Sequence, residues 1–474
     1  MTTLEMHDVV VTHAGRRLVD VPRNRLEQGR PLTVVGESGS GKSLLAHALM
    51  GTLAATLEVD GKLDLDGRLL PLSERANRRQ LWGRDISMLP QEPALALDPT
   101  MRVGRQVEEG ALGVSTQAAR ERAVAALADV GLAGSARSYP HTLSGGMAQR
   151  VAYAAATVGG ARVLVVDEPS KGLDPASVDQ LAALLRRHVD AGGLLLTITH
   201  DLRLAAALGG DVAVMRDAEV VEHGAATEVL EHPVHAYSRR LVAADPARWR
   251  HPWQRTGWTP TGEPLVAATG ISKAYGEQVL FADLDVRVHA GERVALSGPS
   301  GVGKTTLGGA LLRLVRVDAG RVVYQAPLAG RVQKLYQDPA LSFPALVPIE
   351  AGLRDVVRRH GADPQRVEQL VDDLRLAPEL LGRRPSEVSG GELQRLAIAR
   401  MLLARPALVL ADEATSRLDL LTQEVTTDAL VREIGDAALV MVTHDSALAE
   451  AVADTHLYLS GEVSQLPQGY PLVT

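Results

Sequence analysis

Short runs of apolar residues recur along the chain, and each run stops at a glycine or a polar residue. Predominantly apolar runs of this length are typical of strands buried in a parallel sheet. Two runs lead into a glycine-rich segment and a helical pattern, two end in Asp-Glu, and two end in histidine. The pattern predicts an α/β protein whose strands end in polar residues. The runs occupy residues 32–35, 163–166, 194–199, 293–296, 408–411 and 439–442.

The same landmarks occur twice in the same order, so the chain contains an internal repeat. Lys42 and Lys304 occupy matching places in "GESGSGKS" and "GPSGVGKT", 262 residues apart. Further landmarks match at offsets of 244 to 246, because the first copy has about sixteen more residues before "LPQEP" than the second copy has before "LYQDP". The extra segment, "GKLDLDGRLLPLSERANRRQLWGRD", predicts a hairpin followed by a polar helix.

The repeat and the apolar pattern divide the chain into two domains. We expect a first domain at 1–243, a linker at 244–263 and a second domain at 264–474. The stretch 244–264 has four prolines, three tryptophans and no clear apolar period. We expect its tryptophans to hold it against a domain surface.

The composition excludes several kinds of site but does not identify a function. The net charge is −7 with both signs interspersed, so nothing in the sequence requires a nucleic-acid partner. The absence of cysteine excludes disulfides, thiolate zinc sites and cysteine-held iron–sulfur clusters. The first residues lack the apolar core of a signal peptide, and no window approaches the ~18 apolar residues of a membrane span. A role at a membrane would therefore need a separate membrane partner.

Both glycine-rich segments satisfy the pattern G-x-x-x-x-G-K-[ST] between a strand and a helix. Such loops direct backbone N–H groups at phosphate oxygens beside a helix N-terminus. We expect Lys42 and Lys304 to reach the β- and γ-phosphates, and Ser43 and Thr305 to bind magnesium. The predicted loop residues are Gly36, Glu37, Ser38, Gly39, Ser40, Gly41, Lys42 and Ser43 in the first copy, and Gly298, Pro299, Ser300, Gly301, Val302, Gly303, Lys304 and Thr305 in the second.

The paired acids complete a nucleotide-hydrolysis site. Asp167 and Asp412 are predicted to hold magnesium, and Glu168 and Glu413 to polarise the attacking water. A strand that ends in Asp-Glu is weak evidence alone, but its spacing from a phosphate loop makes it specific.

"LSGGMAQR" and "VSGGELQR" distinguish this chain among phosphate-loop enzymes. With these motifs, almost all of both halves resembles a pair of ATP-binding-cassette (ABC) ATPases. The resemblance implies two tandem P-loop NTPase domains, each with a mainly parallel core sheet, an antiparallel β arm and a helical subdomain. It also implies ATP and Mg²⁺ as cofactors.

The resemblance assigns further residues by position. In the family, the Ser-Gly-Gly element binds the γ-phosphate of ATP held by the opposite cassette, and the glutamine senses magnesium and the attacking water. A histidine contacts the γ-phosphate and has a catalytic role, and an aromatic residue stacks on adenine. The matching residues are Ser144, Gly145, Gly146, Ser389, Gly390, Gly391, Gln91, Gln337, His200, His444 and Tyr275. Asp174 and Asp419 match the loop that touches the partner cassette.

His13 stands where the second copy has Tyr275. An imidazole can stack on a base with less area than a phenol ring. Two readings stay open: that His13 contacts adenine, or that the turn is shifted and His13 has no such role.

Several stretches of the first copy, including "EHPVHAYSRRLVAA", resemble the oligopeptide, dipeptide and nickel importer subfamily. The tail at about 231–243 contains His232 and His235, which lack a nearby third metal ligand and match a packing motif. The resemblance implies an importer motor at the cytoplasmic face of the cell membrane. Its partners would be two transmembrane permease subunits and, indirectly, an extracellular solute-binding protein, with peptides, nickel or metal chelates as cargo.

Two other functions remain open. One is a soluble duplicated ABC ATPase that acts on ribosomes or nucleic acid, although such translation factors usually have a long charged insert between cassettes. The other is a cassette protein that serves as an assembly component of an enzyme complex.

Overall fold

The computed structural model describes residues 3–91, 96–249, 255, 257–325, 328, 330–416 and 418–460. The chain divides into two compact units, Met1–Ala243 and Ala244–Thr474. Each unit is α/β and contains a phosphate loop, which agrees with the fold expected from the repeat. Among the described residues, none of the helices combines the length and apolar composition that a membrane span requires.

In the first unit, the described strands form one sheet in the order β5-β4-β1-β2-β10-β9-β3-β8-β7-β6. Strands β9, β3, β8, β7 and β6 are parallel neighbours, whereas β1, β2, β4 and β5 form antiparallel pairs. The strands are β1 (Thr3–His13), β2 (Arg16–Glu27), β3 (Leu32–Val35), β4 (Glu58–Leu65), β5 (Arg68–Pro71), β6 (Ile86–Leu89), β7 (Val163–Asp167), β8 (Leu194–Thr199), β9 (Asp211–Arg216) and β10 (Glu219–Ala225).

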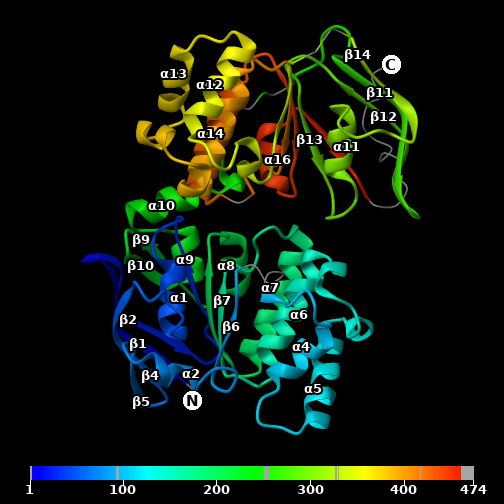
Figure 1. Cartoon of the computed structure of the whole chain (residues 1–474). Coiled ribbons are helices and arrows are strands. Elements are labelled where there is room, and N and C mark those ends of the chain that lie inside the picture. Colours follow the sequence, from blue (N-terminus) through cyan, green and yellow to red (C-terminus); the bar gives the residue numbers. More distant parts are fainter. Residues whose placement is uncertain are drawn as a thin grey trace. The chain divides into compact units, whose positions relative to one another are not determined.

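Helices cover both faces of this parallel region. Figure 1 shows α4, α5 and α6 grouped on the side of the unit away from β1, β2 and β4. The described α-helices of the unit are α1 (Lys42–Met50), α2 (Arg75–Arg79), α4 (Val103–Gly110), α5 (Thr116–Asp129), α6 (Gly145–Thr157), α7 (Pro175–Asp190), α8 (Leu202–Leu208), α9 (Ala226–Glu231) and α10 (Ala236–Ala243). The extra segment of the first copy forms the predicted hairpin, β4 and β5, followed by the short helix α2.

The second unit repeats the plan with two separate sheets. One is antiparallel in the order β12-β11-β14, and the other is parallel in the order β15-β16-β17-β13-β18. Its described strands are β11 (Val266–Tyr275), β12 (Gln278–Val288), β13 (Arg293–Ser297), β14 (Ala319–Tyr324), β15 (Val332–Leu335), β16 (Leu408–Asp412), β17 (Ala438–Val442) and β18 (Thr455–Tyr458). Its α-helices are α11 (Lys304–Leu311), α12 (Ile349–His360), α13 (Gln365–Asp373), α14 (Gly390–Leu403), α15 (Leu420–Glu433) and α16 (Ser446–Val452).

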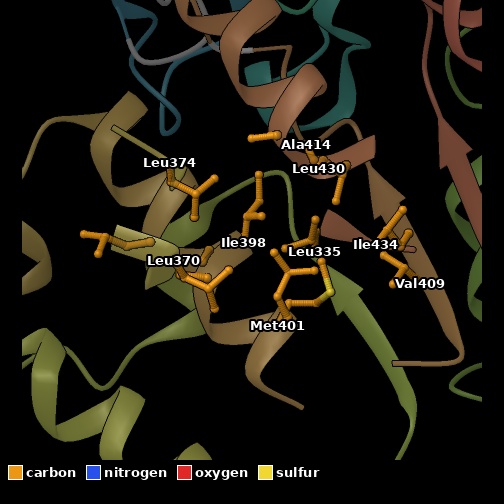
Figure 2. Close-up of a cluster of buried hydrophobic side chains, with 14 of the residues drawn as sticks. Leu335, Leu370, Leu374, Ile398, Met401, Val409, Ala414, Leu430 and Ile434 are labelled. Atoms are coloured by element: carbon orange, nitrogen blue, oxygen red, sulfur yellow. The ribbon is translucent and has the colours of Figure 1, made fainter. Parts of the chain in front are cut away.

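The parallel strands are buried on both faces, which explains their continuous apolar sequences. In β7, Val163 and Val165 face the core that includes α1, whereas Leu164 and Val166 face the core that includes α6 and α7. The second unit has the same alternation. In Figure 2, Leu335 of β15 and Val409 of β16 lie in one apolar cluster with Ile398 and Met401 of α14.

The described part of the predicted linker packs against the second unit at Trp249. Trp249 is buried in the core of the second unit, and its indole Nε1 donates a hydrogen bond to the carbonyl oxygen of Ala244 at 2.9 Å. Arg255 lies over the ring of Trp258 at 5.4 Å. Trp253 lies outside the described residues.

Candidate active sites at the two phosphate loops

Each phosphate loop joins the end of a buried parallel strand to the first turn of a helix. In the first unit the loop connects β3 to α1, and Gly41 immediately before the helix has φ 102°. A Cβ atom on Gly41 would lie 2.3 Å from the carbonyl oxygen of Leu18, and one on Gly36 would lie 2.1 Å from that of Met215. Only glycine fits these positions, because a side chain would displace neighbouring backbone.

The two loop lysines are buried and point back into their own loops. Lys42 Nζ donates to the carbonyl oxygens of Gly36 at 2.8 Å and Glu37 at 2.7 Å. Lys304 Nζ donates to the carbonyl oxygens of Gly298 and Pro299, both at 2.8 Å. Each ammonium therefore lies beside the backbone carbonyl oxygens of its own loop. In this position it can also donate a hydrogen bond to a bound phosphate.

The hydroxyl residue after each lysine contacts the aspartate that ends β7 in the first unit and β16 in the second. Ser43 Oγ lies 3.0 Å from Asp167 Oδ1, and Thr305 Oγ1 lies 2.8 Å from Asp412 Oδ1. Hydroxyl and carboxylate oxygens are hard donors of the kind that Mg²⁺ prefers, so this pair fits the ion in both units. Burial raises the pKa of Asp167, and the hydrogen bond from Ser43 opposes this effect.

The glutamate that follows each aspartate has a left-handed backbone, with φ 46° at Glu168 and 48° at Glu413. This conformation is uncommon outside glycine and is found at functional sites where the surrounding structure enforces it. The enforcing contact is a backbone hydrogen bond, from Glu168 N to Ile198 O at 2.7 Å and from Glu413 N to Val442 O at 3.0 Å. The backbone of this glutamate therefore has the same conformation and the same kind of strand contact in both units.

In the first unit, the glutamate and the strand-end histidine form a close pair. His200 Nδ1 lies 2.7 Å from Glu168 Oε2, and both side chains are largely buried. Burial raises the pKa of Glu168, but the hydrogen bond and charge of His200, with Lys42, lower it by more, so the net pKa lies below the ordinary value. Burial lowers the pKa of His200, but Glu168 raises it by more, so its net pKa lies above the ordinary value.

The second unit arranges the same residue types differently. His444 Nδ1 lies 3.5 Å from Glu413 Oε1, and Gln337 Nε2 donates to Glu413 Oε2 at 2.7 Å. Gln91, its match in the first unit, is exposed just after β6, and the residues that follow it at 92–95 lie outside the described part. The structure thus brings the predicted glutamine and glutamate together in the second unit.

Both Ser-Gly-Gly elements begin a helix, α6 in the first unit and α14 in the second. Ser144 caps α6 by accepting a hydrogen bond from Met147 N at 3.3 Å, and Ser389 caps α14 by accepting one from Glu392 N at 3.4 Å. Ser389 Oγ also lies 2.6 Å from Glu392 Oε2. Within the described residues, the hydrogen bonds of these two serines all stay at their own helix start.

The adenine-stacking candidates occupy the same place in their hairpins. His13 pairs with Arg16 at the end of β1 and β2, and Tyr275 pairs with Gln278 at the end of β11 and β12. The turn in the first copy is therefore not shifted relative to the second. Tyr275 is 56% exposed, and Lys273 Nζ lies over its ring, 5.0 Å from the ring centre. Contact of His13 with adenine stays a prediction.

The remaining predicted residues have local structural roles. Asp174 caps α7 by accepting from Ser177 N at 2.9 Å, and Asp419 caps α15 by accepting from Thr422 N at 3.0 Å. In the tail, Val234 N and His235 N donate to the two carboxylate oxygens of Glu222, at 2.8 and 3.0 Å. Among the described residues, no group of three or more histidine and acidic side chains is arranged to hold a metal ion without the nucleotide.

Two residues that the motifs did not single out contact the sites. The backbone N–H of Glu37 donates to the hydroxyl of Tyr237 in the tail at 3.1 Å. Lys334 Nζ lies 2.8 Å from Asp412 Oδ2. A comparison of the two copies could have found Lys334. It lies three positions before the glutamine, where the first copy has the uncharged residue Met88.

The ABC transporter family matches residues 22–171 and 281–416, which include both phosphate loops and both paired acids. The chain belongs to the ABC transporter family. As in other ABC ATPases, its cassettes bind ATP with Mg²⁺ and hydrolyse it. Ser43 and Asp167 in the first cassette, and Thr305 and Asp412 in the second, are the residues that would hold Mg²⁺, which would neutralise charge on the bound phosphates.

Curated relatives match along both cassettes. The chain is 34% identical to the glutathione import ATP-binding protein GsiA of Salmonella typhi, covering 87% of this chain and 77% of GsiA. It is also 34% identical to the peptidoglycan transport ATP-binding protein YejF of Agrobacterium fabrum, covering 85% of this chain and 80% of YejF.

Among solved structures, an archaeal ribosome recycling factor, aABCE1, determined with the ribosomal stalk protein aP1, matches with a TM-score of 0.67. The match covers 95% of this chain and 87% of that structure at 21% identity. At this identity the likeness shows the tandem-cassette fold alone.

Proposed function

We propose that this chain is the ATP-hydrolysing motor subunit of an ABC importer, with two composite ATP sites formed between its fused cassettes. The observation that carries the proposal is 34% identity, over 85% or more of the chain, to two proteins named for glutathione import and peptidoglycan transport. The subfamily-type tail at 231–243 supports the same assignment. The proposed cargo is a peptide, nickel or a metal chelate.

The proposed partners are two transmembrane permease subunits, which recruit the chain to the cytoplasmic face of the membrane. A surface of the second cassette supports this assignment. Directly after Gln337, Leu341 is 68% exposed, Leu346 is 80% exposed and Val347 is 38% exposed. Large apolar side chains exposed in one short segment are candidates for a protein–protein contact. Because Gln337 contacts Glu413, a partner bound here would lie close to the catalytic residues.

Cysteine cross-linking tests the proposal, because the natural chain has no cysteine. A Leu346→Cys variant, expressed in the source cells and treated with a thiol–amine cross-linker, should form adducts with integral membrane proteins that mass spectrometry identifies as permeases. Leu69→Cys is the matched control, since Leu69 is also an exposed leucine, at 58%, but lies in the hairpin of the first cassette.

The alternative function gives a different result in the same experiment. If the chain acts on ribosomes or nucleic acid, Leu346→Cys should yield ribosomal adducts, and the protein should sediment with ribosomes rather than with membranes. The net charge of −7 argues against a phosphate-backbone partner, which basic surfaces attract.

A further inference from the structure

Asp167 and Asp412, the two aspartates predicted to hold magnesium, differ in one respect: Asp412 also forms an ion pair with a lysine. Asp412 Oδ1 accepts from Thr305 at 2.8 Å, and its other oxygen, Oδ2, is 2.8 Å from Lys334 Nζ. The Lys334 side chain is 16% exposed and that of Asp412 is 10% exposed, so the ion pair is largely screened from water. A charged pair in such surroundings interacts more strongly than one on the surface.

Strand alternation places Lys334 on the nucleotide side of the sheet. Its neighbour Leu335 is buried in the core shared with α14 (Figure 2), so Lys334 faces the opposite side. That side carries Leu408 and Leu410 of β16 and Leu307 and Leu311 of α11, the helix that follows the phosphate loop. The ammonium also lies 5.2 Å from the ring centre of Tyr336, which helps to hold it in place.

The first cassette contains a natural comparison. Met88 pairs with Val165 in β6 and β7, just as Lys334 pairs with Leu410 in β15 and β16. In each cassette the metal-binding aspartate lies two residues further along the second strand. Met88 packs against the apolar core on the α1 side instead of supplying a charge. The two cassettes therefore share a fold in which a lysine is paired with Asp412 and a thioether occupies the matching strand position beside Asp167, on which the charges of His47 and Lys42 act.

We propose that Lys334 makes ATP binding at the second phosphate loop less dependent on Mg²⁺ than ATP binding at the first. Its ammonium shares the carboxylate that contributes to the magnesium site and repels a dication placed beside it. It also supplies a fixed positive charge near the phosphates when Mg²⁺ is scarce. The inference concerns nucleotide binding alone, so it stands or falls separately from the importer assignment.

The test measures ATP affinity at each loop of the full chain, in Mg²⁺ and in EDTA. An azido-ATP photoprobe is titrated, and mass spectrometry of the labelled peptides separates the two cassettes. In the natural protein, removing Mg²⁺ should weaken labelling of the first cassette about tenfold more than that of the second. One unit charge near a dication has an effect of about this size even at the dielectric constant of water.

Reciprocal variants separate this role from a purely structural one. Lys334→Met should increase the Mg²⁺ dependence of the second cassette to that of the first, whereas Lys334→Arg should leave it low. Met88→Lys should decrease the Mg²⁺ dependence of the first cassette. Equal Mg²⁺ dependence of both cassettes in the natural protein, unchanged by Lys334→Met and Met88→Lys, would overturn the proposal.

Discussion

Glu168 and Glu413 each project from a left-handed backbone position held by one hydrogen bond to the neighbouring strand. This geometry suits a general base, because the carboxylate is fixed before the substrate arrives. Replacing both residues with glutamine keeps the shape and removes the base. We expect ATP binding to persist and hydrolysis to fall by on the order of 10²–10⁴. Steady-state ATPase rates and nucleotide binding check this, and natural turnover in the double variant would remove both residues from the mechanism.

The pairing of Glu168 with His200 also predicts a titration shift. In the natural protein the net pKa of His200 is raised, because Glu168 outweighs burial. Glu168→Gln should therefore drop the pKa of His200 below the ordinary histidine value. Since a raised folded-state pKa stabilises at low pH, the stability advantage of the natural chain over Glu168→Gln that comes from His200 should vanish as pH rises through that pKa.

NMR of histidine-labelled protein, with the signal assigned by a His200→Gln variant, measures the pKa. Urea unfolding at several pH values measures the stability difference. An unchanged pKa in Glu168→Gln would mean that the 2.7 Å pair does not persist in solution.

The tail helix α10 supports the first phosphate loop directly. Tyr237 is 6% exposed, Arg216 lies over its ring at 5.0 Å, and its hydroxyl accepts from the backbone of Glu37. Tyr237→Phe removes the hydrogen bond from Glu37 N, with a net cost of about 1 kcal/mol, without opening a cavity. We expect faster amide exchange in residues 36–41 and weaker ATP binding at the first loop only.

Tyr153→Phe is the matched control for this element. Tyr153 is similarly buried, and its hydroxyl donates to Leu184 O at 3.0 Å, between α6 and α7. It should cost comparable stability and leave exchange in residues 36–41 unchanged. Equal effects of the two variants on the loop, measured by hydrogen–deuterium exchange, would show that the tail has no specific role there.

At the scale of the whole molecule, we propose that each ATP is completed by the Ser-Gly-Gly element of the other cassette. A Cβ atom on Gly390 would meet nothing within 4 Å, so Gly390→Asp adds a charge without disturbing its own helix. Gly391 is less suitable, because its Cβ would approach Thr422 at 3.1 Å. Gly390→Asp should weaken photolabelling of the Lys42 loop on the order of tenfold by charge repulsion, and leave the Lys304 loop nearly unchanged.

Gly382→Asp is the control, since Gly382 also has open space around it and lies outside the Ser-Gly-Gly element. It should affect neither loop. Loss of binding only at the Lys304 loop in Gly390→Asp would disprove the crossed arrangement.

The sequence alone determined the features that depend on near neighbours in the chain. The strand–loop–helix order around Lys42, the Asp-Glu pair at the end of β7 and the helix start at Ser144 all follow from local residue patterns. These motifs are readable because a phosphate loop and a helix cap use the backbone of adjacent residues. Duplication made each motif more specific than it would be alone.

Only the tertiary structure decided which distant side chains meet. Sheet order and register bring Lys334 to Asp412, and the folding back of the tail brings Tyr237 to Glu37, 200 residues away. The register of the two hairpins also showed that His13 and Tyr275 occupy equivalent positions in them. No local pattern encodes such contacts, because each depends on which strands become neighbours and which face of a strand a residue occupies.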